Sequence, residues 1–109
     1  TSDPQGAVSR ATARVIEASR RAGLELALKL TAAFSDGHAL YAVRYASDVH
    51  APTLYTSVRN GGRCIVSEPF DREGGDWQVI PPASFVTITG DGMAIRPFVP
   101  ASARLALVV

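Results

Sequence analysis

The sequence predicts an α+β fold in which one N-terminal helix is followed by a mainly antiparallel β-meander. Apolar residues recur at three- and four-residue steps up to residue 23, which is typical of a helix. From residue 24 they fall on every second position, the period of a half-buried strand. Glycine- and proline-containing turns then separate short apolar segments as far as residue 98. We expect a helix over 1–23, strands over 24–98, and a tail over 99–109 that either adds an edge strand or leads into a longer chain.

The helix has recognisable start and stop signals. Asp3 is suited to cap the first turn, and Pro4 suits the first helical position because its missing N–H would have no partner there. Gly23 offers the left-handed conformation in which helices commonly end. A narrow apolar stripe along the helix is formed by Val8, Ala11, Val15, Ala18 and Ala22.

The next segment could be taken for a longer helix, because leucine is a good helix former. Its apolar residues nevertheless alternate from Leu24 to Phe34, which predicts a strand. Asp36-Gly37 follows as a hairpin signal, since glycine accepts positive φ at little cost. We therefore predict a hairpin whose returning strand is Leu40–Tyr45.

The meander is expected to continue through five more strands. Asn60-Gly61-Gly62 and Gly90-Asp91-Gly92 are tight-turn signals, and 71–76 is a polar loop. The expected strands are 53–57, 64–69, 77–81, 84–89 and 93–98.

Composition restricts the class of protein. The 109 residues suffice for one domain or part of one, and 47% hydrophobic with 19% charged residues is a globular composition. A net charge of +1 argues against nucleic-acid or membrane-surface partners, and no apolar run reaches membrane-spanning length. One cysteine excludes an internal disulfide, and two histidines give no metal-ligand spacing. We expect a cytoplasmic protein without metal or cofactor.

Several strand motifs occur in an order that carries a resemblance. Leu30–Tyr45 contains Asp36-Gly37 and the run Leu-Tyr-Ala-Val-Arg-Tyr; the other matching segments are 52–57, 65–69, 77–81 and 84–98. This order resembles class II glutamine amidotransferases, in particular the stand-alone branch that includes the ergothioneine-pathway γ-glutamyl amidohydrolases. Thr56 is a departure, because that branch often has a second tyrosine there.

The resemblance implies the four-layer αββα sandwich of N-terminal-nucleophile hydrolases. In that family an N-terminal cysteine attacks the glutamine side-chain amide, its own α-amino group acts as base, and water hydrolyses the thioester. Backbone and asparagine donors stabilise the oxyanion. The cysteine, the substrate-binding arginine and the oxyanion segment all precede the matched region, so no catalytic residue is carried over to this chain. Residues 1–109 would be a single partial domain, the C-terminal scaffold, inactive alone. Its implied partners are the nucleophile-bearing N-terminal segment and a glutamine or γ-glutamyl substrate; a homo-oligomer is left open.

Three residues are candidates to border a substrate. Arg44 and Glu68 lie in neighbouring predicted strands, where a structural cross-strand ion pair is favoured over a substrate contact. Ser67 could donate a hydrogen bond to a ligand, although Ser-Glu-Pro also serves simply to end a strand.

Other candidates have simpler structural interpretations. Cys64 is the sole thiol, but a core position is favoured over a nucleophile. Thr1 could act as an N-terminal nucleophile, yet it directly precedes a helix cap. His38 and His50 are expected in solvated turns, and Trp77 as the largest core anchor or an aromatic wall of a pocket.

Three hypotheses follow. The leading one is the C-terminal portion of an amidotransferase-like hydrolase. The second is a non-catalytic β-rich interaction module that pairs through exposed sheet edges. The third is an independent hydrolase that uses Thr1 or Cys64.

Overall fold

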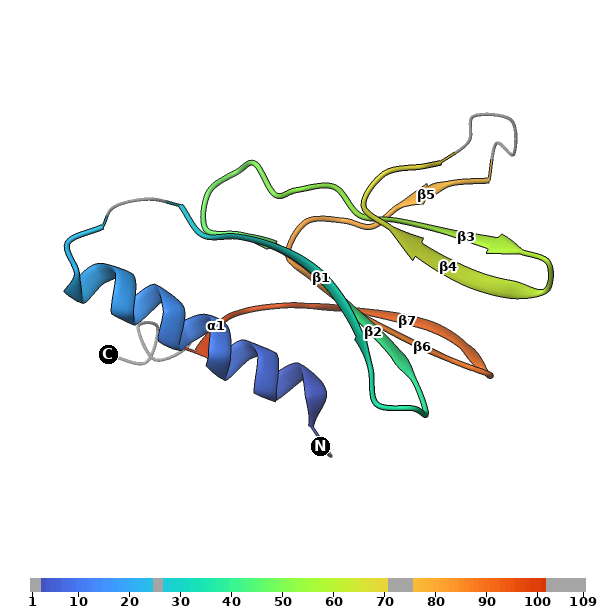
Figure 1. Cartoon of the computed structure of the whole chain (residues 1–109), viewed down its shortest axis with the longest axis horizontal. Helices are drawn as coiled ribbons and strands as arrows, with labels where there is room; N and C mark the ends of the chain where they lie inside the picture. Colours follow the sequence, from blue (N-terminus) through green and yellow to red (C-terminus); the bar gives the residue numbers. More distant parts are fainter. Residues whose placement is uncertain (1–2, 25–26, 71–75, 102–109) are drawn as a thin grey trace.

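A helix and two antiparallel sheets stack in three layers in a computed structural model of the protein (Figure 1). The structure describes residues 3–24, 27–70 and 76–101. The predicted α+β class is confirmed. The elements are α1 (Pro4–Arg21), β1 (Lys29–Ser35), β2 (Leu40–Ala46), β3 (Tyr55–Arg59), β4 (Gly62–Val66), β5 (Gln78–Val79), β6 (Ser84–Thr89) and β7 (Gly92–Pro97).

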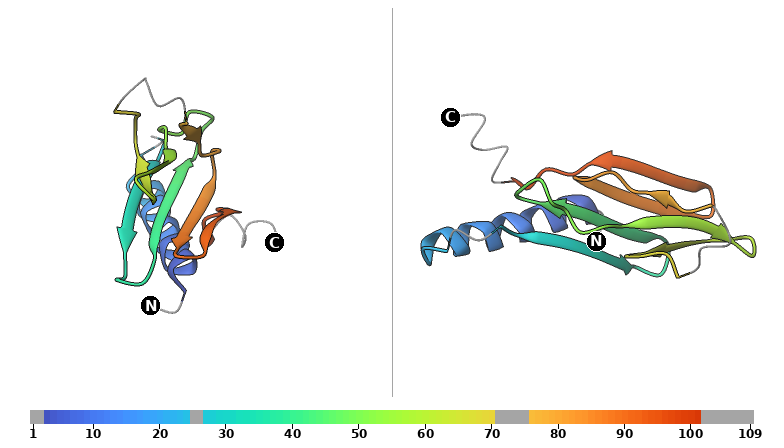
Figure 2. Two further views of the ribbon diagram at one scale, coloured as in Figure 1. Left: turned by 90° about the vertical axis from the view of Figure 1, so that its right-hand side faces the viewer. Right: turned by 90° about the horizontal axis from the view of Figure 1, so that it is seen from above.

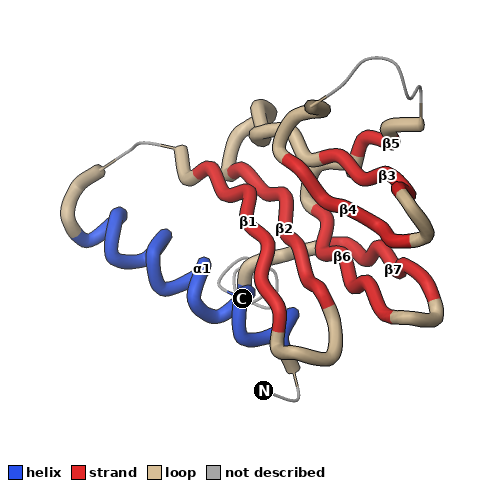
Figure 3. The backbone as a smooth tube through the Cα atoms, turned by 45° about the vertical axis from the view of Figure 1, so that its right-hand side comes forward, coloured by secondary structure: helices blue, strands red, loops and turns tan. Residues whose placement is uncertain are grey.

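The strands divide between two sheets rather than following one another in a single meander (Figure 3). The first sheet has the order β1-β2-β6-β7 and the second the order β4-β3-β5, and every pairing is antiparallel. The β2 strand thus pairs with β6, although β3, β4 and β5 lie between them in the sequence. The local hairpins agree with the sequence; their assembly into two sheets is a long-range arrangement that turn signals do not specify.

The β2 strand is buried on both faces, which explains its nearly continuous apolar sequence. Val43 packs with Phe85 and Phe98 beneath α1, whereas Ala42 packs with Leu54 on the side of the second sheet. Ala42 and Val43 are 0% and 1% exposed. One hydrophobic cluster therefore lies between helix and sheet and the other between the two sheets.

The helix begins and ends as predicted, but a different face is buried. Asp3 accepts a hydrogen bond from the Gly6 N–H at 3.0 Å, and Gly23 adopts φ +76°. Ser9 and Thr12 are buried, whereas Val15 of the apolar stripe is 49% exposed. The segment after β7 returns to α1 (Figure 2). There the Ser9 hydroxyl donates to the Val99 carbonyl at 2.8 Å, so the Ser9 face of α1 is held against this segment.

The first strand starts later than the alternation predicted. Leu24 is 52% exposed, and its N–H donates to the Ser19 carbonyl at 2.9 Å, so it closes the helix C-terminus. Strand β1 begins at Lys29 and pairs with β2 in the expected hairpin, with Ser35 opposite Leu40. Predictions that involve residues 25–26, the 71–75 loop and the tail from 102 lie outside the described residues.

Candidate functional site

A cleft of about 640 Å³ lies beside β1, close to the point where the chain leaves β4. It is lined by Lys29, Thr31, Pro52, Thr53, Ser67 and Glu68. Lys29 and Thr31 come from β1, the 52–53 segment precedes β3, and Ser67 and Glu68 follow β4. The cleft thus combines residues of the first sheet with residues of two connecting segments that adjoin strands of the second sheet.

Arg44 forms the support behind one wall of the cleft. Its side chain comes from β2, opposite Thr31 of β1, and the residue is only 9% exposed. The guanidinium donates from Nε to the Pro52 carbonyl at 2.7 Å, from Nη2 to the Ala51 carbonyl at 3.2 Å and from Nη1 to the Ile80 carbonyl. Because these acceptors belong to two separate connecting segments, Arg44 fixes both against β2.

The expected ion pair between Arg44 and Glu68 is therefore not formed. The hydrogen bonds of the Arg44 guanidinium go to backbone carbonyls, and the described ion pairs involve other residues. The reason is topological, since β2 and β4 belong to different sheets and are not cross-strand neighbours. Of the three candidates, Ser67 and Glu68 line the cleft, and Arg44 lies behind Pro52.

Hydroxyl groups hold the cleft walls in place. The Thr31 hydroxyl donates to the Pro52 carbonyl at 3.1 Å, the same oxygen that accepts from Arg44. The Thr53 hydroxyl donates to the Ser67 carbonyl at 2.9 Å and joins the strand end to the segment before β3. These bonds connect all three wall segments to one another.

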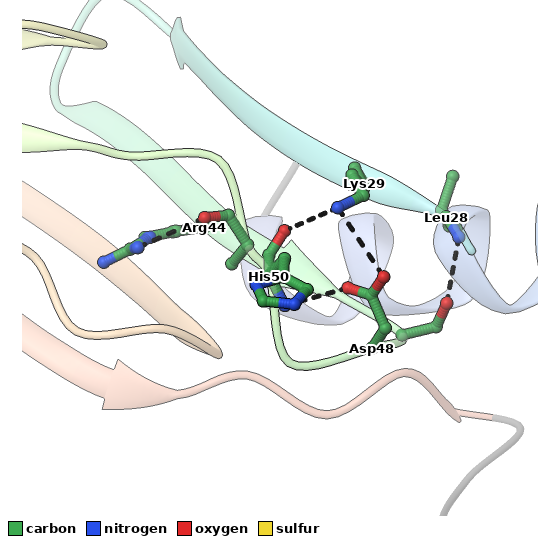
Figure 4. A network of polar contacts seen from close by, with 7 residues as sticks. Leu28, Lys29, Arg44, Asp48 and His50 are labelled. Carbon is green, nitrogen blue, oxygen red and sulfur yellow. Dashed lines mark hydrogen bonds and ion pairs between the residues drawn. The ribbon is translucent and has the colours of Figure 1, made fainter.

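Lys29 is oriented by the loop that follows β2 (Figure 4). Its Nζ donates to the His50 carbonyl at 2.9 Å and lies 3.6 Å from the Asp48 carboxylate. The backbone N–H of His50 also donates to Asp48, which is the main reason that the pKa of this carboxyl lies below its usual value. The Leu28 N–H donates to the Ser47 hydroxyl at 2.9 Å, so the loop is tied both to the first residue of β1 and to the residue before it.

Sequence reasoning missed Lys29, Thr31 and Thr53. A signal was present for Thr31, because a hairpin centred on Asp36-Gly37 places it opposite Arg44. No local pattern marks Thr53, because its place in the cleft depends on how the two sheets are packed. His38 and His50 lie in exposed turns, as expected.

Cys64 and Trp77 lie in different surroundings from one another. Cys64 is partly buried in β4 opposite Ser57, a structural strand position. Trp77 is not a core anchor: it belongs to neither buried cluster, and its ring lies 4.7 Å from the Arg59 guanidinium and 5.1 Å from the Phe70 ring. It does line a second pocket, of about 440 Å³, as the alternative interpretation expected. Thr1 lies outside the described residues.

The described residues form neither a metal centre nor a membrane-spanning helix. Over 3–24, 27–70 and 76–101, no group of three or more histidine, cysteine, aspartate or glutamate side chains could hold a metal ion. No helix in that part of the chain has both the length and the hydrophobicity needed to cross a membrane.

The helix–sheet–sheet stacking agrees with a class II glutamine amidotransferase-like fold. The comparison that establishes it is a solved structure of a glutamine aminotransferase class-II domain protein from Silicibacter pomeroyi. It superposes with a TM-score of 0.85 and 44% sequence identity over 91% of this chain. The resemblance seen in the sequence is therefore confirmed.

The chain spans 45% of the length of that protein. No protein-family model and no curated protein matches the sequence. The three described layers agree with part of the expected αββα sandwich, and the fourth layer remains an expectation for a longer protein.

Proposed function

We propose that this chain is the C-terminal portion of a glutamine amidotransferase-like amidohydrolase. Its role is to supply the scaffold and one side of the substrate cleft, while the N-terminal cysteine lies on a segment outside this chain. The match to the glutamine aminotransferase class-II domain protein, over 91% of this chain but 45% of the other, is the observation that carries the proposal.

The apolar surface of the described layers supports the need for a further segment. Val15 on α1 is 49% exposed, Val79 on β5 56% and Phe70 69%. The strands β1 and β7 stand at the two margins of their sheet in the described part of the chain. Additional strands and helices from a second segment would cover these surfaces and extend the sheets.

In this proposal the reaction is hydrolysis of glutamine or a γ-glutamyl amide. The cysteine of the second segment attacks the amide carbon, its α-amino group accepts the thiol proton, and the amine departs with a proton. Water then cleaves the thioester to release the γ-carboxylate. Ser67 and Glu68 border the substrate directly, and Arg44 acts through Pro52 as a positioning residue.

The experiment starts from the genomic reading frame around the codon for Thr1. A cysteine directly after an initiator methionine upstream is the expected finding. Co-expression of that upstream segment with this chain should give a stable complex that releases glutamate from glutamine or from γ-glutamyl-p-nitroanilide. The matched control replaces the upstream cysteine by alanine, which should keep the complex and abolish hydrolysis. If the two segments formed no complex and the mixture had no amidase activity, the proposal would be contradicted.

A second candidate function is a β-rich interaction module. The marginal strands β1 and β7 favour it, because each presents one unpaired side in the described sheet. A tight homodimer of the isolated chain in light scattering, with no upstream segment in the gene, would favour this candidate over the hydrolase.

A further inference from the structure

A groove of about 850 Å³ runs along the outward face of α1. It shares no residue with the cleft beside β1. Arg14 and Ala18 of its lining are exposed, whereas Ser9 and Thr12, on the other side of the helix, are buried. The lining consists of Arg10, Ala13, Arg14, Glu17, Ala18, Arg21, Ala22 and Ala101.

Small side chains form the floor of this groove. Ala13, Ala18 and Ala22 come from α1, and Ala101 follows β7. Because alanine has no side-chain atom beyond Cβ, another helix can approach α1 to the short end of the usual interaxial distance, roughly 8 Å. The backbone groups in the middle of α1 are bonded within the helix, so the groove offers no ladder of donors and acceptors to an extended strand. A helix, which satisfies its own backbone, suits this surface better.

Arginine side chains flank the floor. Arg10, Arg14 and Arg21 line the groove together with a single acidic residue, Glu17. None of the ion pairs among the described residues involves Arg14. Arg10 lies 3.8 Å from Asp3 and Arg21 lies 3.3 Å from Glu17, but all four side chains are half exposed or more, so both pairs are weak. These guanidinium groups are therefore accessible to carboxylates of a partner.

The distribution of charge distinguishes between possible occupants of the groove. The helix α1 carries four arginines and one glutamate, although the net charge of the whole chain is only +1. A second copy of the chain would place one positive helix against another, which is unfavourable. The described lining has no leucine, phenylalanine or tryptophan that could insert into a lipid bilayer. An acidic protein surface is complementary to the groove in both charge and shape.

We propose that this groove docks an amphipathic helix of a partner protein, with small apolar residues along its contact face and aspartate or glutamate on both sides of that face. The small residues pack on the alanine floor, and the carboxylates accept hydrogen bonds from the flanking guanidinium groups. The inference does not depend on the proposed hydrolase activity, because this chain alone contains every residue involved.

The test is calorimetric titration of the 109-residue chain with a designed acidic peptide. The peptide consists of three copies of the seven-residue unit Ala-Ala-Gln-Ala-Glu-Gln-Glu, which places alanine along one helical face and glutamate on both sides of it. One control peptide has lysine in place of every glutamate, and another has proline in place of one alanine in each unit, which prevents a helix. Each control should bind at least about tenfold more weakly than the acidic peptide, and the affinity for the acidic peptide should fall as the salt concentration rises.

Variants test the two features of the groove separately. Arg14→Glu should weaken the acidic peptide about tenfold, because an attraction is replaced by a repulsion. Arg96→Glu, at an exposed position of β7, changes the net charge of the chain equally and should leave the affinity unchanged. Ala18→Gln adds a long side chain to the floor without a change of charge and should also weaken binding. Circular dichroism verifies that each variant is folded.

Several results would overturn the proposal. Absence of saturable binding of the acidic peptide, or equal affinity for the lysine peptide, would do so. An equal loss in Arg14→Glu and Arg96→Glu would show that only the overall charge of the chain attracts the peptide. Sedimentation of the chain with phosphatidylglycerol vesicles, without binding of the peptide, would assign the arginine face to a membrane surface instead.

Discussion

Arg44 Nε donates to the Pro52 carbonyl at 2.7 Å, and this bond ties the middle of β2 to the wall of the cleft. The same oxygen accepts from the Thr31 hydroxyl at 3.1 Å. One backbone carbonyl therefore joins β1, β2 and the segment that leads into the second sheet. The position of the cleft wall depends on this convergence.

We expect Arg44→Met to lower the free energy of unfolding by about 2–3 kcal/mol, because backbone carbonyls that accept from a buried cation lose their donor. Arg44→Lys should also be destabilising, since a single ammonium cannot reproduce the forked geometry of the guanidinium. Urea denaturation measures both effects. Arg14→Met, at an exposed position of α1, is the control; an equal loss there would contradict the special role of Arg44.

Asp36 organises the β1–β2 hairpin through its ionised carboxylate. It accepts from the His38 and Ala39 N–H groups, both at 2.9 Å, and from the Tyr41 hydroxyl at 3.0 Å. The His38 and Ala39 bonds are the main reason that its pKa falls to about 2. A carboxyl whose pKa is lower in the folded state stabilises the fold above its ordinary pKa of 3.8, and this contribution disappears as the pH falls through about 2.

Asp36→Asn should therefore lower the urea midpoint at pH 7, and the difference from the unchanged protein should shrink between pH 4 and pH 2. The measurement is a series of urea titrations across that range. Asp91→Asn, at the exposed turn of the β6–β7 hairpin, serves as the control. A difference that stays constant down to pH 2 would show that the charge of Asp36 is not responsible.

The β3–β4 turn depends on positive backbone angles. Asn60 and Gly61 have φ of 51° and 78°, the combination that a two-residue hairpin turn requires. Gly61→Ala should destabilise the protein by about 1 kcal/mol through backbone strain alone, since no atom lies within 4 Å of the added methyl group. Gly90→Ala is a close control, because its surroundings are equally open and its φ is not in the left-handed range. Thermal unfolding of the two variants should separate them; equal Tm values would contradict the explanation.

The contrast between these hairpins and the cleft indicates what the sequence could predict. Asp36-Gly37 and Asn60-Gly61 encode their turns locally, so the strands beside them are found correctly to within a few residues. The pairing of β2 with β6 is not local: it joins strands that are separated in the sequence by β3, β4 and β5. The Ala42 and Val43 side chains of β2 are buried on its opposite faces. Resemblance of the strand order to a known family was sufficient to indicate the fold, but not to identify the cleft lining.

The burial of α1 and Trp77 shows why hydrophobicity alone was insufficient. Ser9 is buried, and its hydroxyl donates a hydrogen bond to the Val99 carbonyl, whereas Val15 is exposed in the described chain. Trp77 lies against Arg59 and Phe70, outside both buried clusters. A polar side chain can occupy a buried position when it forms a hydrogen bond there. A large aromatic side chain can be stabilised near the surface by a cation–π contact.

This difference in environment makes a quantitative prediction for the aromatic residues. Phe85 is 2% exposed, and its ring lies within 6.0–6.4 Å of the rings of Tyr41, Phe98 and Phe34, so Phe85→Ala leaves a cavity in the centre of a cluster. We expect a loss of about 3–5 kcal/mol in the free energy of unfolding. Trp77→Ala removes a larger side chain, but one that lies outside both buried clusters and packs against Arg59 and Phe70, with an expected loss of about 1–2 kcal/mol.

The free energy of unfolding of both variants is measured by urea denaturation, with circular dichroism as the signal. Tryptophan fluorescence is unsuitable because Trp77 is the only tryptophan and is absent from one of the variants. Phe70→Ala provides the matched control for the peripheral contact, since Phe70 is 69% exposed and adjoins the same indole ring. If Trp77→Ala proved as costly as Phe85→Ala, Trp77 would anchor the fold after all. The ranking Phe85, then Trp77, then Phe70 would instead establish that the stability of the chain resides in the clusters on the two faces of β2.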